Sequence, residues 1–266
     1  MESAREPSSA RNERMTRLVS GVALAAAALV AIRFLPLLPL RVLACLVAAL
    51  AAKEYLDIVD SPIRAVVLVI ALCWVVSGTT IVSPLILLTM ALLWVGAEVL
   101  ISNHSIQQAS TGIFAAVYIG MPLGMLVAVH GLLGWRATLL LIGTVVVSDS
   151  MQYYTGRLLG RHPLAPAISP KKTIEGAIGG VIFGTAFLTI VGALVLPFSG
   201  YAPLVILGLL VVVLGICGDL FESRLKRTAG MKDSSALIPG HGGVLDRIDA
   251  LLFAVAPFYL YIRNVT

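Results

Sequence analysis

Acidic and basic side chains gather in residues 219–249, between two apolar segments that are each long enough to cross a membrane. Four polar residues at the start of this stretch are spaced i, i+3, i+4 and i+7, which places them on one face of a continuing helix: Asp219, Glu222, Ser223 and Lys226. Charged groups beside a bilayer are costly, so the stretch is a candidate functional site.

A second acidic pair, Asp246 and Asp249, is spaced one turn apart at the start of the next apolar segment, after the turn Gly240-His241-Gly242-Gly243. Glycines let a ligand approach the backbone, and free N–H groups at a helix start favour an anion. The basic residues that lie between the acidic pairs include Lys226, Arg227 and Lys232. The pattern predicts a site for phosphate groups and a divalent metal. Mg²⁺ is the expected metal because it prefers hard oxygen ligands.

The alternative is an ordinary topological loop, since cytoplasmic loops of membrane proteins are commonly rich in lysine and arginine. Such a loop has no need of aspartates that face into an apolar helix, where a buried carboxylate is costly. We therefore favour the metal and phosphate interpretation.

A further aspartate, Asp149, lies deep in the apolar segment 136–156 and shares one helical stripe with Tyr153 and Gly156. An intramembrane aspartate is a functional candidate by default. We expect a metal ion or Arg157 as its partner. A purely structural pair with an arginine is the alternative.

The loop that follows contains Ser169-Pro170-Lys171-Lys172, and Ser169 as N-cap with Pro170 at the first position predicts a helix start here. Lys171 and Lys172 would then oppose the helix dipole, and an anion bound between them would remove that conflict. Three later glycines are expected to pack against a neighbouring helix: Gly176, Gly179 and Gly180.

These stretches resemble the signature of the phosphatidate cytidylyltransferases, also called CDP-diacylglycerol synthases. The resemblance rests on the run Ser223-Arg-Leu-Lys226-Arg227, then Lys232-Asp233, then Pro239-Gly-His241-Gly242-Gly243-Val-Leu-Asp246-Arg247-Ile-Asp249. The family's Ser-Pro-Lys-Lys-Thr-Trp-Glu-Gly and Asp…Tyr-x-x-Gly-Arg-x-x-Gly runs are also matched, with Ile174 for the tryptophan and Gln152 for an alanine. The resemblance covers residues 110–266, and the first hundred match only as generic apolar helices.

The resemblance implies a Mg²⁺-dependent enzyme, expected as a homodimer, that converts CTP and phosphatidate to CDP-diacylglycerol and pyrophosphate. A phosphate monoester is itself an adequate nucleophile toward the α-phosphorus of CTP, so no serine, cysteine or histidine nucleophile is needed. The reaction needs a metal and cationic groups that hold two polyanions in line.

We predict Asp219 and Asp246 as metal ligands, with Asp249 and Asp149 as further ligands or outer acceptors. The catalytic set is predicted to be Asp219, Asp246, Lys226 and Lys172. The substrate-binding set is predicted to be Ser169, Lys171, Lys172, Ser223, Lys226, Arg227, Lys232, His241, Gly242, Gly243 and Arg247. For His241, contact with a phosphate or base and a role in shaping the turn both stay open.

The composition predicts an all-α, polytopic integral membrane protein, because 59% of the 266 residues are apolar and 12% are charged. We expect a polar, disordered tail at 1–16, scaffold helices in 17–110 and a catalytic membrane region in 111–266. About nine transmembrane helices are expected near 16–33, 36–57, 63–78, 80–102, 111–132, 136–156, 175–197, 202–226 and 243–263. The acidic residues after the second helix are expected on a solvated face: Glu54, Asp57 and Asp60.

The net charge of +5 is attributed to membrane orientation and anionic substrates, not to nucleic-acid binding. With the N-terminus inside, only four of the 19 lysines and arginines fall outside: Arg33, Arg41, Arg136 and Arg263. This bias predicts an active site at the cytoplasmic face of the inner membrane.

Two other functions would use similar features. A transporter is disfavoured because its polar residues should lie near mid-membrane in broken helices. A CTP-dependent polyprenol kinase would share the membrane, CTP and Mg²⁺, and would release CDP instead of pyrophosphate.

Overall fold

The computed structural model describes residues 7–78, 84–101, 105–196, 200–238, 240 and 242–265. The fold is nearly all helical. Its helices are α1 (Pro7–Phe34), α2 (Leu37–Ile58), α3 (Ala65–Gly78), α4 (Pro84–Gly96), α5 (Ile106–Ala115), α6 (Met121–Leu159), α7 (Ile174–Val195), α8 (Tyr201–Thr228) and α9 (Leu245–Val265). Two π-helical turns, η1 (Ala97–Ile101) and η2 (Ala116–Gly120), and two short strands, β1 (Pro163–Ala165) and β2 (Ser169–Thr173), complete it.

Each of the nine expected ranges overlaps a helix, with two differences. The elements α5, η2 and α6 follow one another without a loop. Inside α6, Gly134 interrupts the helical geometry with φ 74° and ψ −171°. Glycine adopts this conformation easily because it lacks a Cβ, so one residue separates the two expected segments. The helix α1 begins at Pro7, so residues 7–16 of the expected polar tail are helical, and residues 1–6 of that tail lie outside the described residues. These positions include alanine, arginine and glutamate, which favour helices.

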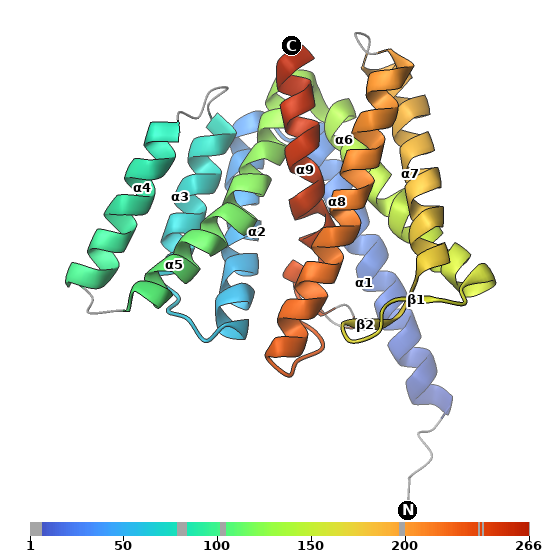
Figure 1. Cartoon of the computed structure of the whole chain (residues 1–266), viewed down its shortest axis with the longest axis horizontal. Helices are drawn as coiled ribbons and strands as arrows, with labels where there is room; N and C mark the ends of the chain where they lie inside the picture. Colours follow the sequence, from blue (N-terminus) through green and yellow to red (C-terminus); the bar gives the residue numbers. More distant parts are fainter. Residues whose placement is uncertain are drawn as a thin grey trace, which may run out of the picture.

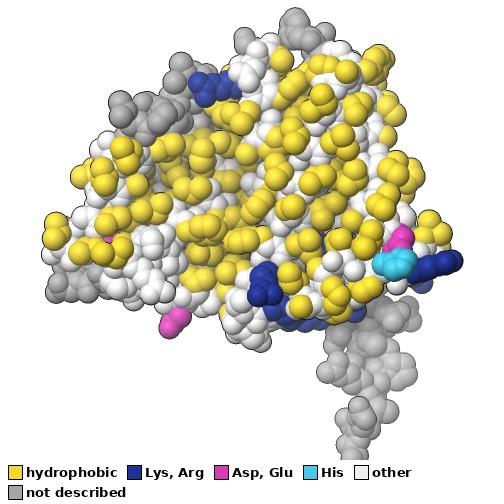
Figure 2. All heavy atoms as spheres, in the orientation of Figure 1, with side chains coloured by type: hydrophobic (Ala, Val, Ile, Leu, Met, Phe, Trp, Pro, Cys, Tyr) yellow, Lys and Arg dark blue, Asp and Glu magenta, His cyan; other side chains and the backbone are white. Residues whose placement is uncertain are grey.

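Four helical runs are long and apolar enough to cross a membrane: Ile106–Leu159, Ile174–Val195, Tyr201–Thr228 and Leu245–Val265. Shorter apolar helices cover Val19–Phe34, Ala65–Gly78 and Leu87–Leu100. Figure 2 shows hydrophobic side chains over most of one face, with lysines and arginines mainly along its lower edge. Large apolar side chains on α7, including Ile182, Ile190 and Leu194, are exposed, which suits contact with lipid. The chain is therefore a helical, multi-pass membrane protein.

The helices α2 to α5 stand on one side of the molecule and α7 to α9 on the other (Figure 1). The start of α1 and the segments that follow α2, α6 and α8 lie at the same end, whereas α9 finishes at the opposite end. The distribution of lysine and arginine predicts that these segments share one side of the membrane, and their position at one end of the molecule agrees with that prediction.

Close packing between α6 and α7 depends on the predicted glycines. A Cβ at Gly176 would lie 2.7 Å from the carbonyl oxygen of Gln152, and Gly179 and Gly180 lie against Thr155 and Gln152. The packing role expected for these glycines is confirmed. An aromatic cluster beneath the polar end joins α2, α5, η2, α8 and α9 through Tyr55, Phe114, Tyr118, Phe221 and Phe253.

The helix start expected at Ser169 is wrong. Ser169–Thr173 forms strand β2, which pairs antiparallel with β1, and α7 begins only at Ile174. Its N-cap is Thr173, whose hydroxyl accepts the N–H of Gly176 at 3.1 Å. The carboxylate of Glu175 accepts the backbone N–H of Arg161 at 3.1 Å and ties the hairpin to α7. Strand pairing and a later cap therefore override the Ser-Pro signal, and the lysines lie on a hairpin instead of a helix terminus.

Candidate active site

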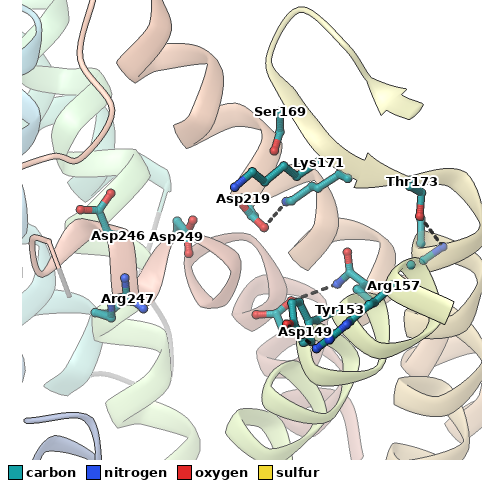
Figure 3. Close-up of a pocket in the computed structure, with 15 residues that line it drawn as sticks. Asp149, Tyr153, Arg157, Ser169, Lys171, Thr173, Asp219, Asp246, Arg247 and Asp249 are labelled. Carbon is teal, nitrogen blue, oxygen red and sulfur yellow. Dashed lines mark hydrogen bonds and ion pairs between the residues drawn. The ribbon is translucent and has the colours of Figure 1, made fainter. Parts of the chain in front are cut away.

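A cavity of about 520 Å³ opens where α6, the β1–β2 hairpin, α7, α8 and α9 meet. Its lining comprises Asp149, Gln152, Tyr153, Gly156, Arg157, Ser169, Lys171, Lys172, Thr173, Gly176, Ala177, Asp219, Asp246, Arg247 and Asp249. Figure 3 shows these side chains converging from the separate elements. Four carboxylates and four cationic side chains line the same space. Such a balanced site can attract both a metal ion and phosphate groups.

Eight residues of the predicted site line this cavity: Asp149, Ser169, Lys171, Lys172, Asp219, Asp246, Arg247 and Asp249. These eight residues come from three separate stretches of the chain, around Asp149, at 169–172 and at 219–249, and the structure brings them to one cavity. Arg157, Gln152 and Thr173 also line it, although none of them was in the predicted set. The spacing of Gln152 and Arg157 from Asp149 along α6 was the available signal.

Arg157, one of the two partners expected for Asp149, does not pair with it. Its Oδ1 accepts a hydrogen bond from the side-chain amide of Gln152 at 3.0 Å. Arg157 lies 3.5 Å from the hydroxyl of Tyr153 instead. An arginine eight positions along the helix is about two turns away, whereas Gln152 is one turn away and within reach.

Lysines pair with two of the predicted metal ligands. Lys172 on β2 forms an ion pair with Asp219 on α8, and Ser223 lies 3.4 Å from the other oxygen of that carboxylate. These side chains are partly open, with exposed fractions of 23% for Lys172 and 27% for Asp219.

The second pair is more deeply buried. The ammonium of Lys226 lies 2.5 Å from Glu222 and 2.5 Å from Asp246. The exposed fractions of the three side chains are 12%, 1% and 5%, respectively. Lys226 therefore faces the carboxylate cluster below the cavity, and it acts on the cavity through Asp246.

Asp246 has two differently used oxygens. Its Oδ2 accepts the backbone N–H groups of Ser234 at 2.9 Å and Gly243 at 2.8 Å, together with the Ser234 hydroxyl at 3.0 Å. Its Oδ1 accepts Lys226. One oxygen is thus fixed by the loop before α9, and the other belongs to the ion-pair network.

The sequence predicts a bound anion at the start of α9, and in the structure a carboxylate of the chain itself, Glu54, takes that place. The N–H groups of Val244 and Leu245 donate to Glu54 on α2, at 3.0 and 2.8 Å. With Gly243 donating to Asp246, these donors are used by carboxylates and not left for a phosphate. Glu54 is 5% exposed, so its expected place on a solvated face is wrong. Its partners lie 180 to 191 positions away, beyond any local pattern.

The other predicted residues that the structure describes are not part of the cavity lining. Arg227 donates to the carbonyl oxygens of Ile168 and Met231 at 3.4 and 3.2 Å, which ties α8 to the hairpin loop. Lys232 is exposed. Gly242 has φ 79°, and a Cβ there would lie 2.5 Å from Asp246 Oδ2. His241 lies outside the described residues.

A metal ion would have suitable donors here, since carboxylate oxygens are the ligands that Mg²⁺ prefers. Within the described ranges, however, no group of three or more Asp, Glu, His or Cys is close enough to hold a metal ion. Lysines are paired with Asp219 and Asp246 instead. The donor chemistry fits a divalent cation, and binding would require Asp219 to exchange its ammonium partner for the ion.

The fold and the cavity define a helical membrane protein with a charged site at one end of its helices. Comparison with known families matches residues 15–265 to the cytidylyltransferase family, so the chain belongs to this family. The match includes the N-terminal helices, which the sequence motifs alone did not reach.

Among curated proteins, the chain is 45% identical to a phosphatidate cytidylyltransferase of Aquifex aeolicus over 46% of this chain and 45% of the relative. It is 40% identical to one of Bacillus subtilis over 56% and 55%. It is 42% identical to an uncharacterized protein, YnbB, of Escherichia coli over 49% and 43%. The chain thus aligns with about half the length of these relatives.

Proposed function

We propose that this chain is a phosphatidate cytidylyltransferase, which transfers the cytidylyl group of CTP to phosphatidate and releases pyrophosphate. The observation that carries the proposal is the cavity, where four aspartates and four cationic side chains meet at one end of apolar helices. Membership of the cytidylyltransferase family and the named relatives support the same activity.

The reaction joins a phosphate oxygen of phosphatidate to the α-phosphorus of CTP, while the bond from that phosphorus to the bridging oxygen breaks and pyrophosphate leaves. Lys171, Arg157 and Arg247 line the cavity and would hold the triphosphate and the lipid phosphate. Lys172 would join them once Asp219 has another cationic partner. Holding two polyanions close together is the main task, because positioning and charge stabilisation dominate phosphoryl-type transfers.

Asp219 and Asp246 are the proposed Mg²⁺ ligands, with Asp249 and Asp149 as further ligands or acceptors. When bound, the ion would neutralise charge on the triphosphate and polarise the α-phosphorus. Asp246 would present its Oδ1 once Lys226 has released it, because three donors of the loop before α9 already occupy Oδ2.

The membrane arrangement follows from the substrates. We infer nine transmembrane helices with the cavity at the cytoplasmic face of the inner membrane, where CTP is available and the acyl chains of phosphatidate stay in lipid. This placement is supported by the segments after α2, α6 and α8, which share one end of the molecule (Figure 1). A homodimer is proposed from the family resemblance alone.

Position-specific labels on CTP test the activity. Purified protein in detergent is incubated with phosphatidate, Mg²⁺ and CTP labelled at the α- or the γ-phosphorus. We expect the α-label in the lipid and the γ-label in pyrophosphate. Transfer of the γ-label to a lipid would identify a kinase instead, and no transfer of either label would refute the proposal. Asp219→Asn should abolish transfer, whereas the exposed Asp57→Asn on α2 should leave it unchanged.

A further inference from the structure

Glu54, near the end of α2, is a buried carboxylate with four hydrogen-bond donors in one distant segment. Its Oε1 accepts the Ser235 hydroxyl at 2.7 Å and the N–H of Val244 at 3.0 Å. Its Oε2 accepts the Ser234 hydroxyl at 2.9 Å and the N–H of Leu245 at 2.8 Å. All four donors belong to the segment that joins α8 to the first turn of α9.

Burial of a carboxylate is costly unless donors surround it, so these contacts are needed to keep Glu54 in place. The contacts also satisfy two of the N–H groups that a helix start leaves without intrahelical partners, and the negative charge suits the positive end of α9. The packing leaves no space at Gly243, where a Cβ would collide with the Ser234 hydroxyl and the Glu54 carboxylate. Glu54 thus fixes the start of α9 from a different helix.

Ser234 links Glu54 to the cavity. Its hydroxyl lies 2.9 Å from Glu54 Oε2 and 3.0 Å from Asp246 Oδ2, so the two carboxylates share its single proton. The backbone N–H of the same residue donates to Asp246 Oδ2 at 2.9 Å. Any shift of Ser234 therefore moves two of the three donors that fix this oxygen of Asp246.

We propose that Glu54 is a positioning residue for the transfer reaction, which orients Asp246 through the segment Ser234–Leu245. The inference rests on the proposed function where its test measures kcat of the transfer reaction. It assigns a specific task to the N-terminal helices, because α2 supplies a carboxylate on which the geometry of the cavity depends. Glu54 does not line the cavity, so it acts through Ser234 and Asp246 and not on substrate.

A structural contact and a positioning contact make different predictions for the folded enzyme. If Glu54 only stabilises the fold, its replacement lowers the yield or the melting temperature and leaves kcat per folded molecule unchanged. If Glu54 orients Asp246, kcat falls while KM for CTP changes little, because the lost interaction matters most in the transition state.

The test uses three variants of the full chain in detergent: Glu54→Gln, Ser234→Ala and Asp57→Asn. Glu54→Gln retains the shape and removes the charge and one acceptor oxygen. We expect its kcat to fall about tenfold or more, since hydrogen bonds to charged groups are the stronger ones. Ser234→Ala removes only the shared hydroxyl, so a loss of roughly threefold to tenfold is expected. Asp57→Asn removes the same charge one turn further along α2 at an exposed position and serves as the matched control.

Two further measurements separate the explanations. For the double variant Glu54→Gln/Ser234→Ala, the fold-decrease in kcat should be smaller than the product of the two single fold-decreases, because both changes act through one hydrogen-bond network. Amide hydrogen exchange should accelerate in peptides covering 234–245 for Glu54→Gln and stay unchanged for Asp57→Asn. Exchange needs no substrate, so it reports on the segment independently of catalysis.

A wild-type kcat in folded Glu54→Gln, or unchanged exchange in 234–245, would overturn the inference. Should Glu54→Gln fail to fold, Ser234→Ala decides: a normal kcat there also overturns it. Should wild-type protein transfer no cytidylyl group, the proposed function fails. The exchange comparison then still decides whether Glu54 holds the segment.

Discussion

Replacement of Lys226 by methionine tests the buried ion-pair network directly. The ammonium lies 2.5 Å from both Glu222 and Asp246, and the side chain of Glu222 is 1% exposed. Methionine has a similar length and no charge, so two buried carboxylates would face each other without a cation. Removal of one partner from a buried ion pair costs about 3–5 kcal/mol. Because Lys226 is 12% exposed and the neighbourhood can admit water, we take the lower value of about 3 kcal/mol.

The expected effect is a large fall in thermal stability. At roughly 2–4 °C per kcal/mol for a chain of this size, the melting temperature should fall by about 6–12 °C. The assay is thermal unfolding of the purified protein in detergent. Arg224→Met is the matched control, since it removes a positive charge from an exposed position on the same helix. Adding Glu222→Gln to Lys226→Met should recover part of the loss, because one unpaired carboxylate disappears.

An unchanged melting temperature for Lys226→Met would refute the reasoning, as would an equal fall for Arg224→Met. Failure of Glu222→Gln to restore stability would show that the loss comes from packing and not from charge.

Three further outcomes follow from the geometry. Gly242→Ala should lower activity and cost about 1–2 kcal/mol in thermal unfolding, because φ is 79° and its Cβ would meet Asp246, whereas Gly230→Ala, also at positive φ but in open space, should retain activity. Thr173→Ala removes the N-cap of α7 and should destabilise by about 1 kcal/mol, with Thr173→Ser restoring stability; an unaffected melting temperature would contradict the cap. Lys172→Met removes the cation that competes for Asp219, so Mn²⁺ binding followed by electron paramagnetic resonance should tighten by roughly threefold to fivefold, and weaker binding would show that the lysine does not occupy the metal position.

The residues that carry charge into apolar helices could be found from the sequence. Asp149, Asp219 and Asp246 stand out because a membrane segment tolerates few carboxylates, and all three line one cavity. The helix ranges could be predicted from the lengths of the apolar runs, because a helix needs about 20 apolar residues to cross a membrane. Gly134 could be placed between two segments, although its left-handed φ is visible only in the structure.

Features that depend on distant pairing were missed. Glu54 resembles an acid on an amphipathic helix end, and nothing within one or two turns of it indicates its partners in 234–245. The Ser169-Pro170 signal is locally a good helix start, but pairing with Pro163–Ala165 makes it a strand. In both cases a local pattern had two physical solutions, and contacts outside that pattern selected one: a neighbouring strand for Ser169 and a distant segment for Glu54.

The two sides of the cavity are built differently, and this difference bears on how the site can act. On the α9 side, three donors from the preceding loop fix one oxygen of Asp246, and Glu54 holds that loop from α2. On the α8 side, Asp219 is held by one partly exposed lysine and a long contact to Ser223. A charged ligand can therefore displace Lys172 at low cost, whereas Asp246 cannot move without disturbing α2, α8 and α9 together. With the proposed divalent cation bound, Asp219 would exchange the ammonium of Lys172 for the ion, and that ammonium would become available to a phosphate group while Asp246 stays in place.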